Sequence, residues 1–174
     1  MTAAVLVLLG LVALAGLAST VRGERSGAAA GAGAVALVVA LAAAGAFAWA
    51  GEGSPGPVQA GAVLAVLAAV TGGGPVATAV LHAADPAATG VSGGPQDPDI
   101  LRGGAWIGVL ERGAVAGTLL VGWPEGLAVV LAVKGLGRFS ELRAPAAAER
   151  FIVGTLASGL WAAACVGVAV LLRG

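Results

Sequence analysis

The sequence predicts an all-α, polytopic helical membrane protein, and three observations carry this prediction. Hydrophobic residues make up 59% of the chain and charged residues only 10%, whereas a soluble domain is about 45–50% apolar and about 25% charged. The mean hydropathy is +0.99. The chain contains several uncharged runs. Their length is close to the roughly 20 apolar residues that a helix needs to cross the hydrocarbon core. Together these observations exclude a water-soluble globular domain and a disordered chain.

We expect about six transmembrane helices within a single integral membrane domain that covers residues 1–174. Four segments carry no charge and meet the length requirement directly: 2–21, 27–50, 58–81 and 151–172. Two weaker segments contain charged residues: 103–122 and 123–142. The chain therefore divides into three uncharged spans in 1–81, a connecting loop at 82–102, and three further spans in 103–174.

The first segment is interpreted as a retained span rather than a cleaved signal peptide. A signal peptide begins with basic residues and has a short apolar region. Here no Lys or Arg precedes the apolar run, and the arginines Arg22 and Arg25 follow it. We therefore count this segment among the membrane spans.

The placement of the arginines predicts the orientation in the membrane, because basic residues concentrate in the cytoplasmic loops of membrane proteins. If both termini lie outside, the loops 22–26, 82–102 and 138–150 are cytoplasmic, and the outer loops carry no Lys or Arg. The longest loop, 82–102, is interpreted as a solvated connector, and a cation site at Asp97 and Asp99 is the less favoured alternative. The inner arginines are then Arg22, Arg25, Arg102, Arg138, Arg143 and Arg150, against Arg173 on the outer side.

The third span contains three glycines followed by a proline, which favours a break or a kink in the helix. An interrupted helix lines the binding site in several transporters, whereas a simple kink near the inner end has no functional consequence. The kink is the favoured interpretation. The residues concerned are Gly72, Gly73, Gly74 and Pro75.

Glu111, Arg112 and Lys134 lie within predicted spans, where a charge near the bilayer centre costs about 2.5–3.5 kcal/mol on insertion scales. At ~1.5 Å per residue, Glu111 lies ~13 Å above Arg102 and Lys134 lies ~13 Å below Glu125, so both approach the midplane of a ~30 Å core. The two segments are antiparallel neighbours, and we predict a Glu111–Lys134 ion pair. Arg112 lies ~100° further round its helix and needs a different partner or water.

A polar stripe is expected on the fifth segment. Lys134, Arg138 and Glu141 recur at helical spacing and would run from the midplane to the cytoplasmic side. Glu149 and Arg150, at the start of the sixth segment, can meet the lower end of this stripe. The charges either hold the bundle together or line a polar path for an ion, a proton or a lipid headgroup, and both interpretations stay open.

The sixth segment presents one face of small or aromatic residues, Gly154, Ser158, Trp161 and Cys165, which is interpreted as a packing surface. Cys165 is the single cysteine of the chain. This excludes an intramolecular disulfide and a multi-cysteine metal site.

Several motifs fall within 103–172. They are Trp106-Ile107-Gly108-Val109-Leu110-Glu111-Arg112, Ala132-Val133-Lys134, Arg138-Phe139 and, after Glu149, Gly154-Thr155-Leu156-Ala157-Ser158. In these motifs the chain resembles a family of small, uncharacterised bacterial multi-pass membrane proteins with a W-I-G-x-L-E-R motif and a later A-K-S-x-x-R-F motif. Gly135 departs from the serine that is usual in the family. The resemblance implies family membership and a place in the bacterial inner (plasma) membrane, but no mechanism.

The composition and the absence of known motifs argue against several classes of function. The net charge of zero gives no case for nucleic-acid binding. A phosphate-binding P-loop, an HExxH zinc motif and a GxSxG nucleophile elbow are all absent from the sequence. His82 is the only histidine, so we expect no metal, no cofactor and no catalytic residue, and an enzyme is the less favoured class.

Three classes of function stay open, and the lipid bilayer is the expected surrounding in each. The leading hypothesis is a non-enzymatic helical bundle that assembles with or regulates a partner membrane protein, or forms a homo-oligomer, because the chain is small and its helices are rich in small residues. The alternative is a small transporter or channel subunit that uses the cluster of Glu111, Arg112, Lys134 and Arg138. The third is a lipid-acting membrane enzyme.

Overall fold

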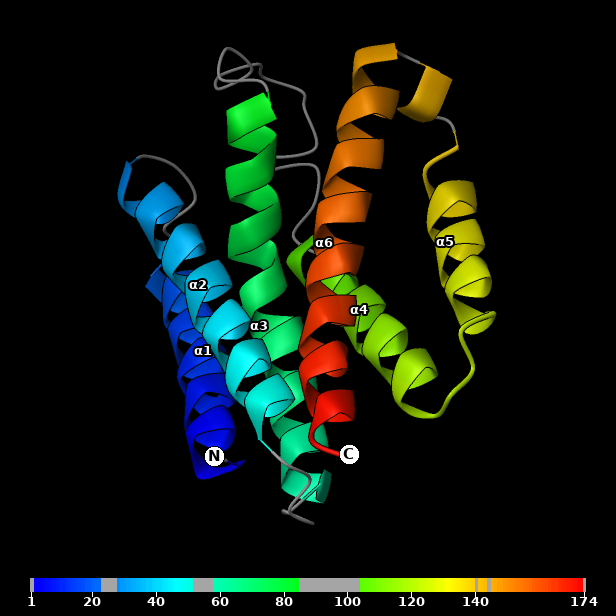
Figure 1. The fold of residues 1–174 in the computed structure, drawn as a ribbon. Coiled ribbons are helices and arrows are strands. Elements are labelled where there is room, and N and C mark those ends of the chain that lie inside the picture. The colour runs from blue at the N-terminus through cyan, green and yellow to red at the C-terminus, as the bar shows by residue number, and fades with distance from the viewer. Residues whose placement is uncertain are drawn as a thin grey trace.

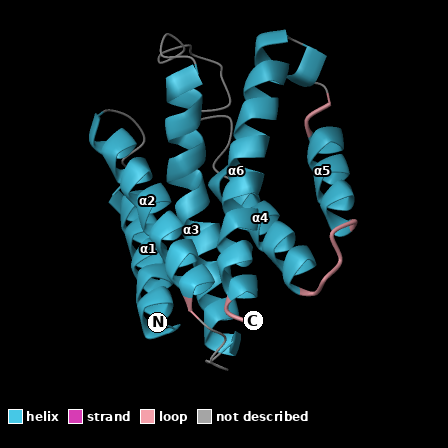
Figure 2. Cartoon of the chain, viewed as in Figure 1, coloured by secondary structure: helices cyan, strands magenta, loops and turns pink. Residues whose placement is uncertain are grey.

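The computed structural model describes residues 2–22, 28–51, 58–84, 104–139, 141–143 and 145–173. These residues form helices joined by turns, and none of them lies in a strand (Figure 2). The all-helical prediction is thereby confirmed, and each of the six predicted segments contains one α-helix. The elements are α1 (Thr2–Arg22), α2 (Ala28–Ala50), α3 (Val58–Ala84), α4 (Gly104–Leu120), α5 (Gly126–Gly137), the short 3₁₀ helix η2 (Glu141–Arg143) and α6 (Pro145–Leu171).

Four of the helices, α1, α2, α3 and α6, are long and apolar enough to cross a membrane, by length and composition. The chain is thus a helical membrane protein. Helix α4 has 17 residues and α5 has 12. At ~1.5 Å per residue they measure ~25 Å and ~18 Å, less than a ~30 Å hydrocarbon core. Of the about six transmembrane helices expected, four are long enough to cross, and the helix within 123–142, whose full span the sequence left open, is short.

The boundaries of two helices differ from the sequence prediction. Helix α3 continues to Ala84, so His82 lies in its last turn and not in the following loop. The rest of the predicted loop, with Asp97 and Asp99, falls outside the described residues. Helix α6 begins at Pro145, and proline is favoured at the first position of a helix, where no N–H is needed. Glu149 and Arg150 are therefore helical residues and not loop residues.

The helices alternate in direction, and both termini lie at the same end of the bundle (Figure 1). Helix α3 is central, since it packs against α1, α2, α4 and α6. Helix α4 slopes behind α6 in this view, and α5 returns along the outside, at the right of the picture. Among the described elements, the backbone of α5 comes within packing distance of α4 alone. The α4–α5 hairpin therefore stands apart from the long helices at its α5 side.

Small residues on α3 allow this close packing of helices. The buried residues of α3 are mainly glycine and alanine, among them Ala65, Ala68 and Gly72. A Cβ added to Gly16 of α1 would lie 2.7 Å from the backbone nitrogen of Gly72, so these two backbones touch directly. Without a hydrophobic driving force in lipid, such close approach is what holds helices together.

Helix α3 is continuous through the Gly72–Pro75 segment, with Pro75 inside it. The less favoured alternative from the sequence, a break in the helix, is therefore wrong. Proline removes one helical N–H donor and leaves the carbonyl four residues earlier, that of Thr71, without its usual partner. The hydroxyl of Thr71 donates to the carbonyls of Ala13, at 2.9 Å, and Leu67, at 2.8 Å. This links α1 to the turn of α3 that precedes the proline.

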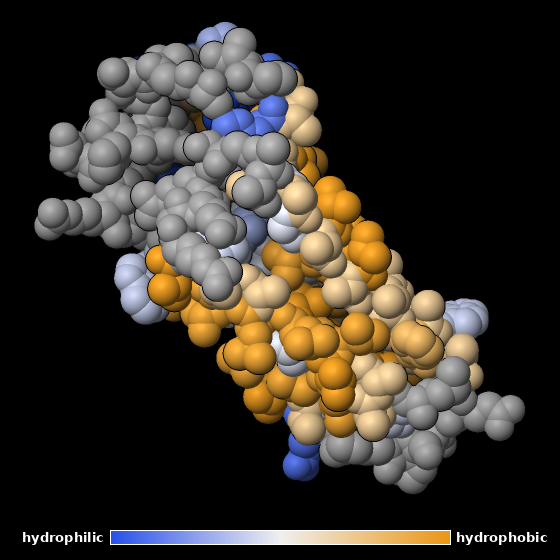
Figure 3. All heavy atoms as spheres, turned by 90° about the vertical axis from the view of Figure 1, so that its left-hand side faces the viewer, coloured by the Kyte–Doolittle hydropathy of each residue, from blue (hydrophilic) through white to orange (hydrophobic). Residues whose placement is uncertain are grey.

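Apolar residues cover the middle of the face shown in Figure 3, and hydrophilic residues are seen toward the two ends of the molecule. Large apolar side chains point outward on the long helices, as at Leu14, Val35 and Leu160. Outward-facing apolar side chains are expected where the surroundings are lipid rather than water. The distribution agrees with helices that cross a membrane.

Candidate functional site

The Nζ of Lys134 lies 2.6 Å from the Oε2 of Glu111. Both side chains are largely shielded, with 19% and 18% of their area exposed. The ion pair predicted from the sequence is confirmed. The ammonium of Lys134 also lies 5.7 Å from the ring centroid of Phe151 on α6, within the range of a cation–π contact. Lys134 therefore links α5 to both α4 and α6.

The turn between α4 and α5 brings the two charges together. Gly122 has φ +75°, a left-handed conformation that glycine adopts without steric cost. The N–H of Trp123 donates to the carbonyl of Thr118 at 2.8 Å. Gly126 begins α5 against Thr118 and Trp123, and a Cβ there would lie 2.5 Å from the Thr118 methyl group. This tight turn reverses the chain and sets α5 antiparallel to α4.

Arg112 is buried, with 7% of its area exposed. Its Nε donates to the carbonyl of Val70 on α3 at 3.0 Å, and its Nη1 lies 3.5 Å from the Oγ of Ser158 on α6. The sequence indicated a partner other than Lys134, and the structure supplies a backbone carbonyl and a hydroxyl. Arg112 thus connects α4 to the two long helices beside it.

Two glycines make room for this arginine. A Cβ at Gly73 would collide with the Cδ of Arg112, and a Cβ at Gly108 would lie 3.1 Å from its Nη1. Gly72, beside Gly73, faces the ring of Trp161, whose Nε1 donates to the carbonyl of Ala68 at 3.0 Å. The glycines that suggested a break in α3 therefore serve to admit Arg112 and Trp161.

A cavity of about 260 Å³ lies among α3, α4, α5 and α6. Of the described residues that line it, one is a carboxylate, Glu111, and four are basic: Arg112, Lys134, Arg138 and Arg150. Apolar side chains complete the wall, among them Leu81, Ile107, Leu142 and Phe151. The predicted charge cluster of Glu111, Arg112, Lys134 and Arg138 is thus brought together around one cavity with a basic lining.

The predicted polar stripe is only partly formed. Lys134 and Arg138 line the cavity, but α5 ends at Gly137 and Glu141 belongs to the separate helix η2. Glycine is among the weakest helix formers, and Gly135 and Gly137 both fall in the last turn of α5. Glu149 is exposed on α6 and is absent from the residues lining the cavity, whereas Arg150 lines it. The backbone of Glu141 therefore does not continue the helix that carries Lys134.

Thr155 and Ser158 of α6 also line the cavity. Ser158 is 8% exposed, and the Oγ1 of Thr155 is shielded and has no hydrogen-bond partner within the described part of the chain. The sequence placed Ser158 on a packing face with Trp161 and Cys165, and all three are buried. Thr155 could not be singled out as a cavity residue from the sequence, since a lone threonine in an apolar helix gives no functional signal.

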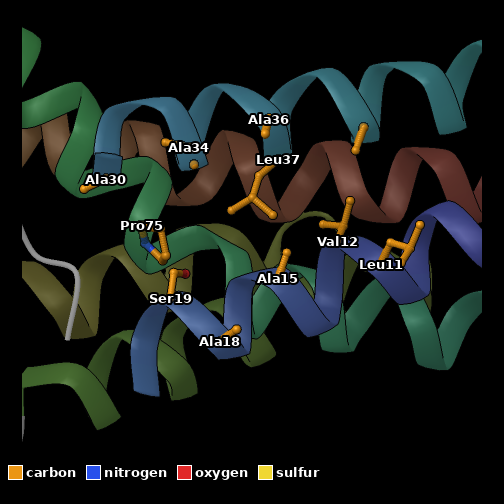
Figure 4. Close-up of a pocket in the computed structure, with 12 residues that line it drawn as sticks. Leu11, Val12, Ala15, Ala18, Ser19, Ala30, Ala34, Ala36, Leu37 and Pro75 are labelled. Carbon is orange, nitrogen blue, oxygen red and sulfur yellow. The ribbon is translucent and has the colours of Figure 1, made fainter. Parts of the chain in front are cut away.

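A second cavity, of about 350 Å³, lies between α1 and α2 and is bordered by Pro75 of α3 (Figure 4). Its lining is apolar or small, as at Leu11, Ala34 and Leu37, with Ser19 at one end. The hydroxyl of Ser19 donates to the carbonyl of Gly16 at 2.9 Å. None of the described residues that line this cavity is ionisable, and the basic cavity is the better candidate site.

The described residues contain no group of three His, Cys, Asp or Glu side chains that could hold a metal ion. Comparisons with known protein families, with curated proteins and with solved structures found no match for this chain. The function is therefore argued from the basic cavity alone.

Proposed function

We propose that this chain is a multi-pass membrane protein that takes up an anionic ligand into the cavity among α3, α4, α5 and α6, as a small transporter or as a subunit of one. The observation that carries the proposal is the lining of that cavity, which among its described residues has four basic side chains and one carboxylate. A surplus of positive charge in a low-dielectric site attracts an anion.

The alternative, that these charges only hold the bundle together, is supported by the pair of Glu111 and Lys134. The Nζ of Lys134 and the Oε2 of Glu111 lie 2.6 Å apart, so each charge neutralises the other. Arg112, Arg138 and Arg150 face the same cavity, and side chains of like charge gathered in one place repel each other. An anionic ligand would reduce this repulsion, and this supports a binding role.

A binding assay on the full chain in detergent tests the proposal. Thermal unfolding would be followed in sodium chloride, acetate, sulfate and phosphate at matched ionic strength. We expect at least one anion to raise the midpoint, and the double variant Arg138→Gln, Arg150→Gln to lose most of that rise. Arg173→Gln is the matched control, because Arg173 is exposed at the far end of α6. Equal midpoints in every salt would contradict the proposal.

The transport role is tested separately in proteoliposomes. We expect flux of the stabilising anion above the flux of empty liposomes, reduced in the same double variant. Binding without flux would overturn the transport role and retain the binding site.

We also propose the membrane orientation and the family. Both termini outside, with the basic ends of α5 and α6 in the cytoplasm of a bacterial cell, follow from the distribution of arginine. The motifs shared with the small bacterial membrane protein family lie on α4, α5 and α6, the helices that line the cavity. Reporter fusions at the C-terminus test the orientation, since alkaline phosphatase is active outside and green fluorescent protein fluoresces inside.

A second candidate function is assembly with a partner membrane protein, and one observation favours it. Helix α5 packs against α4 alone among the described elements and turns Leu131, Val133 and Leu136 outward. A partner helix laid on this face would complete its packing. Cross-linking from cysteines placed at Val133 in native membranes tests this, and cross-links to lipid-facing controls such as Val35 should be absent.

A further inference from the structure

The guanidinium of Arg112 has N–H donors that no described residue accepts. A guanidinium carries five N–H donors, and among the described residues two of them have acceptors, the carbonyl of Val70 and the hydroxyl of Ser158. No carboxylate lies within ion-pair distance of Arg112 in the described part of the chain, since Glu111 is paired with Lys134. A buried guanidinium whose N–H donors are only partly used is unfavourable in a membrane. Arg112 is therefore positioned to receive an anion from the cavity that it lines.

Two hydroxyl groups on α6 stand beside this arginine. Ser158 contacts its Nη1 at 3.5 Å, and Thr155, three residues earlier on the same helix face, also lines the cavity. The Oγ1 of Thr155 has no partner among the described residues. Buried polar atoms are nearly always hydrogen-bonded, so this hydroxyl is a donor that a ligand in the cavity could engage.

The arrangement of these donors indicates the class of anion. A carboxylate has two coplanar oxygens, which one guanidinium satisfies by itself. A phosphate presents oxygens in several directions and carries up to about two negative charges. Donors that come from both α4 and α6, with the basic side chains of Arg138 and Arg150 in the same cavity, match the second geometry. We propose that the part of this cavity lined by Arg112, Thr155 and Ser158 binds a phosphate group, which these three side chains hold.

The proposal rests on the proposed function and names the class of its ligand. The phosphate is either free or part of a lipid headgroup, and the cavity suits both sources. Its volume of about 260 Å³ and its apolar wall residues, such as Leu142 and Phe151, leave room for atoms bonded to the phosphate.

The experiment uses the full chain, purified in a phosphate-free maltoside detergent, with thermal unfolding and equilibrium binding as readouts. The probes are inorganic phosphate, dihexanoyl phosphatidic acid, sodium acetate and dihexanoyl glycerol, which has the tails without the phosphate. The decisive variant is Thr155→Val, which removes the hydroxyl and keeps the shape. We expect it to weaken the binding of phosphate-bearing probes about tenfold, as for one hydrogen bond to a charged group.

The same variant should not lower the melting temperature of the ligand-free protein, because its hydroxyl has no partner to lose. Thr118→Val is the matched control, since the hydroxyl of Thr118 bonds within its own helix, to the carbonyl of Val115 at 2.9 Å, and is not part of the cavity lining. It should leave phosphate binding unchanged. Unaltered phosphate affinity in Thr155→Val would overturn the assignment of the site.

The probes separate the remaining outcomes. Binding of both phosphate-bearing probes supports a site for free phosphate, and binding of phosphatidic acid alone, without dihexanoyl glycerol, supports a lipid headgroup. Binding of acetate without either phosphate probe would overturn the phosphate site and leave the proposed anion-binding function standing. If no anion binds, both the phosphate site and the proposed function fail.

Discussion

The Nε of Arg112 donates a hydrogen bond to the carbonyl of Val70 on α3, 3.0 Å away. The arginine reaches this carbonyl because Gly73 carries no side chain that would block it. A cation from one helix thus binds directly to the backbone of another. Arg112 and Gly73 form one packing unit across the interface of α3 and α4.

Gly73→Ala should lower stability by about 1–3 kcal/mol, because its methyl group collides with the side chain of Arg112. Gly74→Ala is the adjacent control, since the nearest atom to its Cβ is the Nη2 of Arg112 at 3.9 Å, an ordinary contact. The control should be neutral or slightly stabilising, as alanine favours helix. Thermal unfolding in detergent measures both variants. Equal melting temperatures would show that the side chain of Arg112 moves aside without lowering the free energy of unfolding.

Reversing the charge of Glu111 or Lys134 should reduce the amount of folded protein in the membrane. Glu111→Lys and Lys134→Glu each place two like charges at the position of the 2.6 Å pair. The double variant restores an opposite pair and should recover part of the loss, as a coupled pair does in a double-mutant cycle. Size-exclusion chromatography of a fluorescent fusion reports the folded fraction.

Glu125→Lys serves as the control for these reversals, because Glu125 is exposed in the turn between α4 and α5. It should leave the folded fraction unchanged. A double variant that loses the sum of the two single effects would argue against any coupling between Glu111 and Lys134.

Gly16→Ala should separate α1 from α3. Its Cβ would lie 2.7 Å from the backbone nitrogen of Gly72, which cannot rotate away. The expected cost is about 1–3 kcal/mol. Gly10→Ala, on the same helix, has nothing within 4 Å of the added carbon and should be tolerated. Similar melting temperatures for the two variants would contradict a direct backbone contact between α1 and α3.

Trp161→Phe should destabilise the protein by about 1–3 kcal/mol, because it removes the 3.0 Å hydrogen bond to the carbonyl of Ala68 and part of the buried ring. Trp49→Phe is the control, since Trp49 is 80% exposed and should change stability little. The intrinsic fluorescence of the remaining tryptophans follows unfolding in both. A cost at Trp49 as large as at Trp161 would refute this packing.

Cys165 should resist maleimide labelling in the folded protein, because its side chain is fully buried. Labelling should become complete in sodium dodecyl sulfate. An added cysteine at Ala146, which is exposed near the start of α6, should be labelled in both conditions. Rapid labelling of Cys165 in mild detergent would contradict the position of α6 in the bundle.

The pairing of Glu111 with Lys134 could be predicted from sequence, because two expensive charges lay on neighbouring antiparallel segments at matching depth. The partners of Arg112 could not. One of them, the carbonyl of Val70, is a backbone atom, and every residue has one, so no pattern of residue types indicates it. The hydroxyl of Ser158 is recognisable only once α4 and α6 are known to touch.

The alternative of a break in α3 was wrong, and the helix at 123–142, whose full span the sequence left open, is short; both outcomes have physical reasons. Glycines before a proline weaken an isolated helix, but here the same glycines let Trp161 and Arg112 pack against α3, and packing outweighs local propensity. The second outcome follows because counting apolar residues measures hydrophobicity and not where a helix ends. Helix α5 ends at Gly137, directly before Arg138, although the expected segment extended to Leu142.

The α4–α5 hairpin also has a consequence for how the chain is made. Lys134 follows Glu111 by 23 residues, and at about 5–20 residues per second the ribosome needs roughly 1–5 s to deliver it. During this interval the carboxylate of Glu111 lacks its partner Lys134. Arg112 lacks one of its partners for longer, because Ser158 is synthesised later still. Helix α4 must therefore wait beside the insertion machinery, so slowing or pausing translation between these codons should increase degradation of the nascent chain.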